Sequence, residues 1–148
     1  MREYEYDIVV VGGGPGGAMA AKNAAEKGKS VLVVEKRPEI GVHVRCGEGL
    51  AKDLLEETGI KPDSRWIDLE VDGARLFAPD ERYHIDVDQR RAGAETGYVI
   101  DRGRFDKHLI TLAVKAGADL WLKSPAVAVE YADGTVSGST LFGEAIRP

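Results

Sequence analysis

The sequence has little cysteine and no long hydrophobic run, and each lack excludes a class of protein. Its single cysteine, Cys46, cannot form an internal disulfide, and no paired Cys/His spacing typical of a zinc site occurs. We therefore predict no metal site. Apolar runs such as Ile8–Val11 and Val31–Val34 contain four residues, whereas a membrane-spanning helix needs roughly 20. We predict that the chain does not cross a membrane.

Clustered positive charge is also lacking. The chain has 20 Lys and Arg residues against 25 Asp and Glu residues, a net charge of -5, and no basic stripe of the kind that binds nucleic acid. Nucleic acid is therefore not an expected partner. The N-terminus carries Arg2, Glu3 and Glu5 and lacks the apolar segment and cleavage site of a signal peptide. We expect a cytoplasmic protein.

The beginning of the chain has the pattern of a βαβ unit. A strand is predicted over 6–11, a glycine turn over 12–17, a helix over 18–27 and a second strand over 30–35. Both strands are continuous Val/Ile/Leu runs without polar alternation, which is typical of parallel strands covered by helices on both faces. The sequence therefore predicts an α/β fold with a parallel sheet.

Later segments alternate between short strands and helices. Period-two alternation between Trp66 and Asp88 predicts antiparallel strands that turn near Ala78–Asp80. Apolar residues at helical spacing from Phe105 onward predict an amphipathic helix ending at Gly117. The remaining predictions are a loop over 41–49, a helix over 50–58, strands over 98–100 and 119–122, and a hairpin of 126–131 with 135–141 around Asp133–Gly134.

The glycine turn fits the pattern G-x-G-x-x-G, directly after a strand and at the start of a helix. Gly12 allows the tight turn, Gly14 lets a pyrophosphate approach the backbone, and Gly17 lets the helix pack closely on the strand. Free N–H groups of the first helical turn, together with the helix dipole, attract phosphate. A glycine turn alone can be purely structural, so this motif leaves both interpretations open.

Glu35 favours dinucleotide binding. It ends the second predicted strand, where a carboxylate accepts hydrogen bonds from an adenosine ribose. An acid here disfavours a 2′-phosphate, so FAD or NAD is expected rather than NADP, although Lys36 and Arg37 follow directly. The alternative is a solvated acid at a strand end.

Four blocks of the sequence resemble the geranylgeranyl reductase family, in particular its archaeal members that act on glycerophospholipids. They are Asp7-Ile-Val-Val-Val-Gly-Gly-Gly-Pro-Gly-Gly17, Glu35-Lys-Arg-Pro-Glu-Ile-Gly41, Arg45-Cys-Gly-Glu-Gly49 and Tyr98-Val-Ile-Asp-Arg-Gly-Arg-Phe-Asp106. The resemblance covers nearly the whole chain, and its most specific block is 45–49. Val42-His43 departs from the family pattern, which has a small residue and a proline there.

The resemblance implies a Rossmann-type FAD-binding domain that is incomplete in this chain. Its nucleotide-binding core would comprise residues 1–50 and 98–148, with 62–97 as an inserted antiparallel β segment. FAD would be contacted at its phosphates by Gly16 or Gly17, at the ribose by Glu35, near the flavin by Cys46, Gly47 and Gly49, near the cofactor by Arg102, and near the adenine by Ala126. For Arg102 the alternative is a surface arginine beside Arg104.

The activity that the resemblance implies is the reduction of isoprenoid double bonds in ether lipids of archaeal membranes. An isoprenoid lipid substrate, an external electron donor such as NAD(P)H or ferredoxin, and transient contact with a membrane surface as a peripheral protein would follow. Cys46, its pKa lowered by neighbouring Arg45, would assist proton delivery; the alternative is a small hydrophobe packed in a glycine loop. Two further functions stay open: another FAD-dependent monooxygenase or dehydrogenase of this superfold, and a non-catalytic FAD-binding fragment. We do not expect the chain to turn over by itself.

Overall fold

The computed structural model describes residues 3–88, 97–132, 135–140 and 145–147. The elements are β1 (Glu3–Glu5), β2 (Ile8–Val11), α1 (Pro15–Glu26), β3 (Val31–Val34), β4 (Gly49–Ala51), α2 (Lys52–Glu57), β5 (Ile67–Val71), β6 (Gly73–Phe77), β7 (His84–Asp88), β8 (Gly97–Ile100), α4 (Arg102–Lys115), β9 (Asp119–Trp121), β10 (Ala126–Ala132), β11 (Thr135–Thr140) and β12 (Ala145–Arg147). They form two compact units, one of residues 1–43 with 106–148 and one of residues 44–105.

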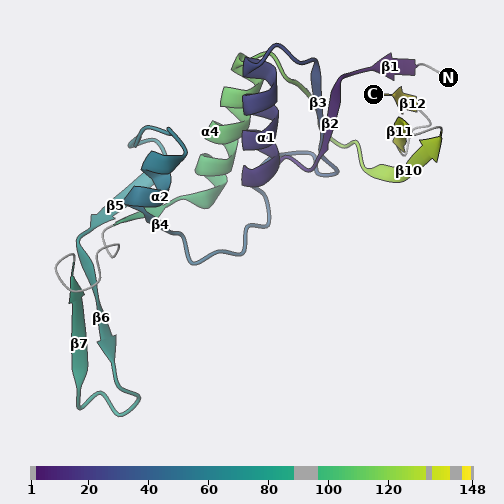
Figure 1. Ribbon diagram of the computed structural model, residues 1–148. Coiled ribbons are helices and arrows are strands. Elements are labelled where there is room, and N and C mark those ends of the chain that lie inside the picture. The colour runs from purple at the N-terminus through teal and green to yellow at the C-terminus, as the bar shows by residue number, and fades with distance from the viewer. Residues whose placement is uncertain (1–2, 89–96, 133–134, 141–144, 148) are drawn as a thin grey trace. The chain divides into compact units, whose positions relative to one another are not determined.

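A parallel sheet of β2, β3 and β9 forms the centre of the first unit, with β3 in the middle (Figure 1). All four residues of β3 are buried, and α1 packs against β2 and β3. Leu32 and Val34 pack with Tyr6, Val9 and Trp121. The α/β fold with a βαβ start is thereby confirmed. β2 is less covered than predicted, because it lies at the edge of this sheet.

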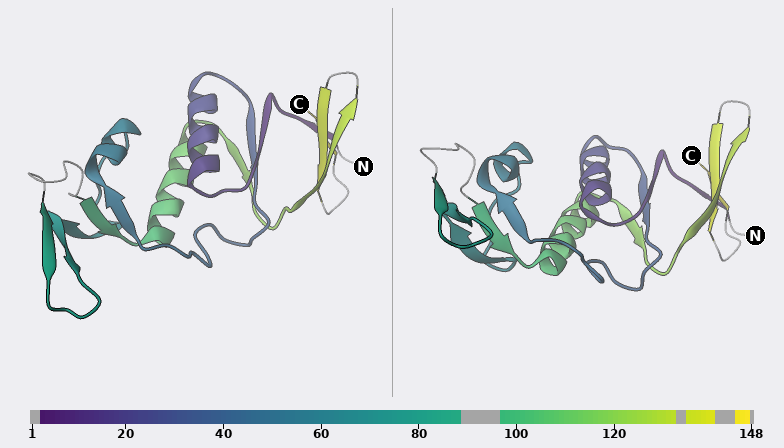
Figure 2. Two further views of the ribbon diagram at one scale, coloured as in Figure 1. Left: turned by 60° about the horizontal axis from the view of Figure 1, so that its bottom comes forward. Right: turned by 90° about the horizontal axis from the view of Figure 1, so that it is seen from below.

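The second unit is antiparallel. β8 pairs with β4 on one side and β5 on the other, and β6 pairs with β7 in the hairpin that Figure 2 shows in teal. Ala78 donates its N–H to the carbonyl of Tyr83 at 2.8 Å, which closes the turn where one was predicted. The predicted helix over 50–58 is wrong at its start, because residues 49–51 pair with β8 and α2 begins only at Lys52.

A four-stranded sheet in the first unit joins the two ends of the chain in the order β1, β12, β11, β10. The β10–β11 hairpin confirms the predicted strand pair, while Asp133–Gly134 lies outside the described residues. Strand β1 was not predicted; it pairs in parallel with β12, more than a hundred residues away.

The two compact units divide the chain between residues 43 and 44 and between residues 105 and 106. Strands β4 and β8 thus belong to the second unit. The division into a nucleotide-binding core and an insertion at 62–97 stays a prediction. In the part of the chain that the structure describes, no helix is long and apolar enough to cross a membrane.

Candidate functional site

The glycine turn between β2 and α1 has the conformation that its motif requires. Gly12 has a φ of +102°, which disfavours any residue with a side chain, and its N–H donates to the carbonyl of Val34 at 2.8 Å. A Cβ added to Gly17 would lie 2.0 Å from the carbonyl oxygen of Gly12, so helix and strand approach too closely for a side chain. A Cβ at Gly14 would meet no atom of the described residues within 4 Å. This face of the turn is open to a ligand.

The first turn of α1 carries no acidic side chain that would repel an anion. Gly14 is its N-cap without a capping side chain, and Pro15 occupies the start of the helix, where its missing N–H has no helical partner to lose. The N–H groups of Gly16 and Gly17 are among the first four of the helix and therefore have no partner within it. Backbone donors and helix dipole together suit a pyrophosphate, so these residues fit the phosphates of a dinucleotide.

Glu35 follows β3, and its carboxylate is held at both oxygens. The N–H of Gly13 donates to Oε2 at 2.9 Å and the N–H of Arg37 donates to Oε1 at 2.9 Å. The carboxylate therefore lies beside the glycine turn. Gly13 was not among the predicted site residues, although its N–H holds Glu35; a Cβ there would lie 2.4 Å from Cδ1 of Ile40, so that side chain would have to shift.

Ala126 begins β10, and the residues before it are tied to the segment after β3. The N–H of Lys123 donates to the carbonyl of Arg37 at 3.0 Å, and the N–H of Ser124 donates to the carbonyl of Glu35 at 2.8 Å. The first unit therefore brings together the glycine turn, Glu35 and the two residues Lys123 and Ser124 that shortly precede Ala126.

In the second unit, Cys46 lies exposed on the loop before β4. The pKa of its thiol is lowered, first by the N–H of Glu48, which donates to Sγ at 3.4 Å, and then by a hydrogen bond with the side chain of Arg102. The lowered pKa agrees with the prediction, but its predicted cause is wrong, since Arg45 is not among the groups that shift it. Gly47 and Gly49 are exposed, and a Cβ at either would meet no atom within 4 Å.

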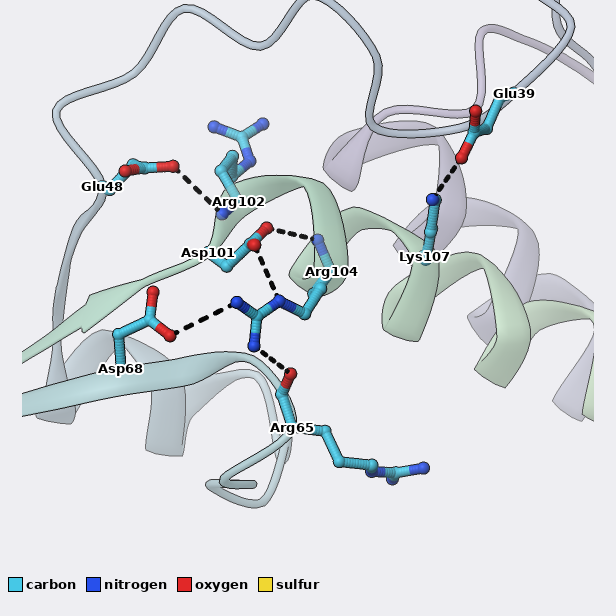
Figure 3. A network of polar contacts seen from close by, with 8 residues as sticks. All are labelled: Glu39, Glu48, Arg65, Asp68, Asp101, Arg102, Arg104 and Lys107. Atoms are coloured by element: carbon cyan, nitrogen blue, oxygen red, sulfur yellow. Dashed lines mark hydrogen bonds and ion pairs between the residues drawn. The ribbon is translucent and has the colours of Figure 1, made fainter.

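Glu48 connects the cysteine loop to the start of α4; it lies in the block 45–49 but was not predicted as a site residue. Its carbonyl accepts the N–H of Ile100 at 2.9 Å, and its Oε1 accepts the N–H of Arg102 at 3.3 Å (Figure 3). Its φ of +58° is unusual for a residue with a side chain. The second unit thus brings Cys46, Gly47, Gly49 and Arg102 together around Glu48.

Arg104 differs from Arg102 in what it contacts. Asp101 caps α4 by accepting the N–H of Arg104 at 2.8 Å, and the guanidinium of Arg104 donates to the other carboxylate oxygen at 2.7 Å. It also donates to the carbonyl of Arg65 at 3.2 Å and pairs with Asp68 (Figure 3). Arg104 therefore holds structure in place, whereas the half-buried Arg102 faces the cysteine loop. The same figure shows the ion pair of Glu39 with Lys107 in the first unit.

Comparison with known proteins agrees with this geometry. A family model described as FAD binding domain matches residues 7–89, more than half of the chain. Digeranylgeranylglycerophospholipid reductases of Thermoplasma volcanium and Picrophilus torridus are 54% and 50% identical over 94% and 98% of this chain. The match covers 35% of the length of each relative.

Solved structures of other proteins are also similar to this chain. A geranylgeranyl bacteriochlorophyll reductase-like protein from Thermoplasma acidophilum has a TM-score of 0.90 and 49% identity over 98% of this chain and 38% of its own. The flavin-dependent brominase Bmp2, at 20% identity and a TM-score of 0.75, over 97% of this chain and 36% of its own, shares the fold. The expected resemblance to geranylgeranyl reductases is confirmed. The chain belongs to the FAD-binding domain family, and its cofactor is FAD.

Proposed function

We propose that this chain forms the FAD-binding part of a reductase that saturates geranylgeranyl double bonds of ether lipids in archaeal membrane lipid biosynthesis. The observation that supports this function most is the identity of 50–54% to digeranylgeranylglycerophospholipid reductases over nearly the whole chain. Because the chain spans about a third of those relatives, the complete activity is proposed for a longer protein.

The proposed FAD contacts are the following. Gly14, Gly16 and Gly17 would hold the pyrophosphate through backbone N–H groups at the open face of the turn, and Gly12 would contribute by giving the turn its shape. Glu35, fixed beside that turn, would accept the ribose hydroxyls, and the backbone of Ala126 would lie near the adenine. For the flavin end we propose Cys46, Gly47, Gly49 and Arg102, since the exposed glycines leave room for a flat ring system.

When bound, reduced FAD supplies the hydride that one carbon of the double bond accepts. The thiol of Cys46 would give a proton to the other carbon, so that both new C–H bonds form as the π bond breaks. A thiol is a better acid when its thiolate is stabilised, and the Glu48 N–H and Arg102 side chain provide that stabilisation. The thiolate would then recover a proton from solvent. An external donor, NAD(P)H or ferredoxin, would return the electrons.

The substrate would be an isoprenoid lipid, so we propose that the complete protein makes transient contact with the cytoplasmic surface of the membrane. The chain would act there as a peripheral protein. Binding to vesicles of archaeal ether lipids, measured by sedimentation, tests this location.

Two measurements test the function, one on the purified chain and one on the longer protein that contains it. Flavin absorption bands retained by the chain through desalting would show that it holds FAD by itself. The longer protein, with its flavin reduced, is then mixed anaerobically with a geranylgeranyl glycerophospholipid, with the saturated lipid as control. We expect reoxidation only with the unsaturated lipid, accompanied by a gain of two hydrogen atoms per reduced double bond, and slower reoxidation for Cys46→Ser and Cys46→Ala. Flavin that the longer protein holds but that both lipids leave reduced contradicts the proposed reductase activity.

A further inference from the structure

One residue, Arg37, connects three segments around the adenosine side of the proposed FAD site. Its backbone N–H donates to Oε1 of Glu35 at 2.9 Å, and its carbonyl accepts the N–H of Lys123 at 3.0 Å. Its guanidinium donates through Nη1 to the carbonyl of Val42 at 3.1 Å. All of these residues belong to the first unit.

The guanidinium closes the turn that follows β3. Between Arg37 and Val42 the chain has no helix or strand, so the hydrogen bond of Nη1 to the Val42 carbonyl spans an irregular segment. Inside this turn, the buried side chain of Ile40 packs against the glycine turn, since a Cβ at position 13 would lie 2.4 Å from its Cδ1. Opening the turn 37–42 would therefore move the N–H of Arg37, which holds Glu35, and the side chain of Ile40, which packs on the glycine turn.

Glu35 needs this support because a glutamate side chain has several rotamers of similar energy. Its Oε2 accepts the N–H of Gly13 and its Oε1 accepts the N–H of Arg37, so the two bonds together fix the plane of the carboxylate. A carboxylate held in this way loses less conformational freedom when a ligand binds, and preorganisation of this kind raises affinity. A guanidinium suits the clamp since it is charged at every physiological pH and its donors are held in a plane.

We propose that Arg37 is a positioning residue for the adenosine half of FAD, which clamps the turn 37–42 and thereby holds Glu35 toward the ribose. It acts through Glu35 and through the Lys123 segment that leads to Ala126. This role rests on FAD binding by the chain and is independent of the reductase activity.

The test is a titration of FAD into the chain, followed by quenching of flavin fluorescence, in a double-mutant cycle. Arg37→Met keeps the side-chain length and removes the donors, and Lys36→Met is the matched control for loss of a neighbouring positive charge. We expect Arg37→Met to weaken FAD binding about tenfold, the loss of one hydrogen bond to a fixed group, and Lys36→Met to change it by less than about twofold. In a Glu35→Gln background, the effect of Arg37→Met should fall to about twofold or less.

Amide hydrogen exchange without ligand provides the second measurement. We expect Arg37→Met to speed exchange at Gly13 and Lys123, and Lys36→Met to leave both unchanged. An equal effect of Arg37→Met on FAD binding in the parental chain and in the Glu35→Gln background would mean that Arg37 acts on FAD directly, and it would overturn the proposal. Unchanged exchange would overturn it as well. A parental chain that binds no FAD would overturn it together with the FAD site, whereas a longer protein that binds FAD but reduces no lipid contradicts only the reductase.

Discussion

Replacing Gly17 by alanine tests the close packing of helix α1 on strand β2. The added Cβ would lie 2.0 Å from the carbonyl oxygen of Gly12 and 3.2 Å from Cγ1 of Val10. Because Cβ atoms essentially never come within 3.0 Å of another heavy atom, and the nearest atom here is backbone, the helix or strand must shift by at least 1.0 Å, the difference of 3.0 and 2.0.

The magnitude follows from a comparison with Gly16→Ala in the same helical turn. A Cβ at Gly16 would meet no atom within 4 Å, so this substitution gains helix propensity, at most about 1 kcal/mol. Gly17→Ala gains the same propensity but forces an overpacked contact, which costs about 1–3 kcal/mol. Since the propensity gain cancels in the comparison, Gly17→Ala should be less stable than Gly16→Ala by about 1–3 kcal/mol.

The assay is urea unfolding followed by far-UV circular dichroism. With a slope of about 1–3 kcal/mol per molar urea, the two midpoints should differ by about 1 M, with Gly16→Ala at or above the parental value. Equal midpoints for the two variants would refute the close approach of Gly17 to Gly12. A lower midpoint for Gly16→Ala than for Gly17→Ala would refute the open space at Gly16.

Three further predictions concern titratable groups. Arg102→Met should raise the pH midpoint of Cys46 alkylation by iodoacetamide, because the side chain of Arg102 lowers the pKa of the thiol. Glu48→Gln removes a charge that raises this pKa, so it should not raise the midpoint, and equal midpoints for the two variants would contradict this. Burial and Asp119 raise the pKa of Tyr6 to about 12, so its contribution to stability is complete below about pH 10 and is lost as the pH rises toward 12. The urea midpoint should therefore fall between about pH 10 and pH 12 in the parental chain and fall less in Tyr6→Phe. Asp101→Ala should cost about 1 kcal/mol by removing the cap of α4, and Asp101→Asn, measured by the same urea titration, should cost less because the amide oxygen still accepts the N–H.

Local patterns in the sequence predicted the βαβ unit, because each of its parts depends on near neighbours. The Val/Ile runs give β2 and β3, and glycine is needed at position 12 for its φ of +102° and at position 17 for its lack of a Cβ. Residues 49–51 were predicted as loop and helix since Leu50 and its successors have helical spacing. Their strand conformation depends on pairing with β8, about fifty residues away, which no local pattern reveals.

Pairing between distant segments also limited the prediction of the site. The sequence identified Glu35, but its orientation depends on backbone N–H groups, which every residue except proline carries. The hydrogen bond by which Arg37 holds the turn could not be predicted either. Its acceptor is the backbone carbonyl of Val42, and because every residue has such a carbonyl, the residue type at position 42 gives no sign of the contact. Arg102 and Arg104 are equivalent in sequence, and only the position of Asp101 at the start of α4 assigns one of them to the helix cap.

Glu48 shows why family motifs and physical patterns find different residues. A glutamate is disfavoured at a φ of +58°, where glycine would be free of strain, so the local sequence argues against this conformation. It persists because the carbonyl of Glu48 accepts from Ile100 and its carboxylate accepts from Arg102, and together these contacts offset the strain. Glycine at this position would keep the backbone and lose the carboxylate. The strained glutamate therefore joins the cysteine loop to the first turn of α4, where the side chain of Arg102 lowers the pKa of Cys46.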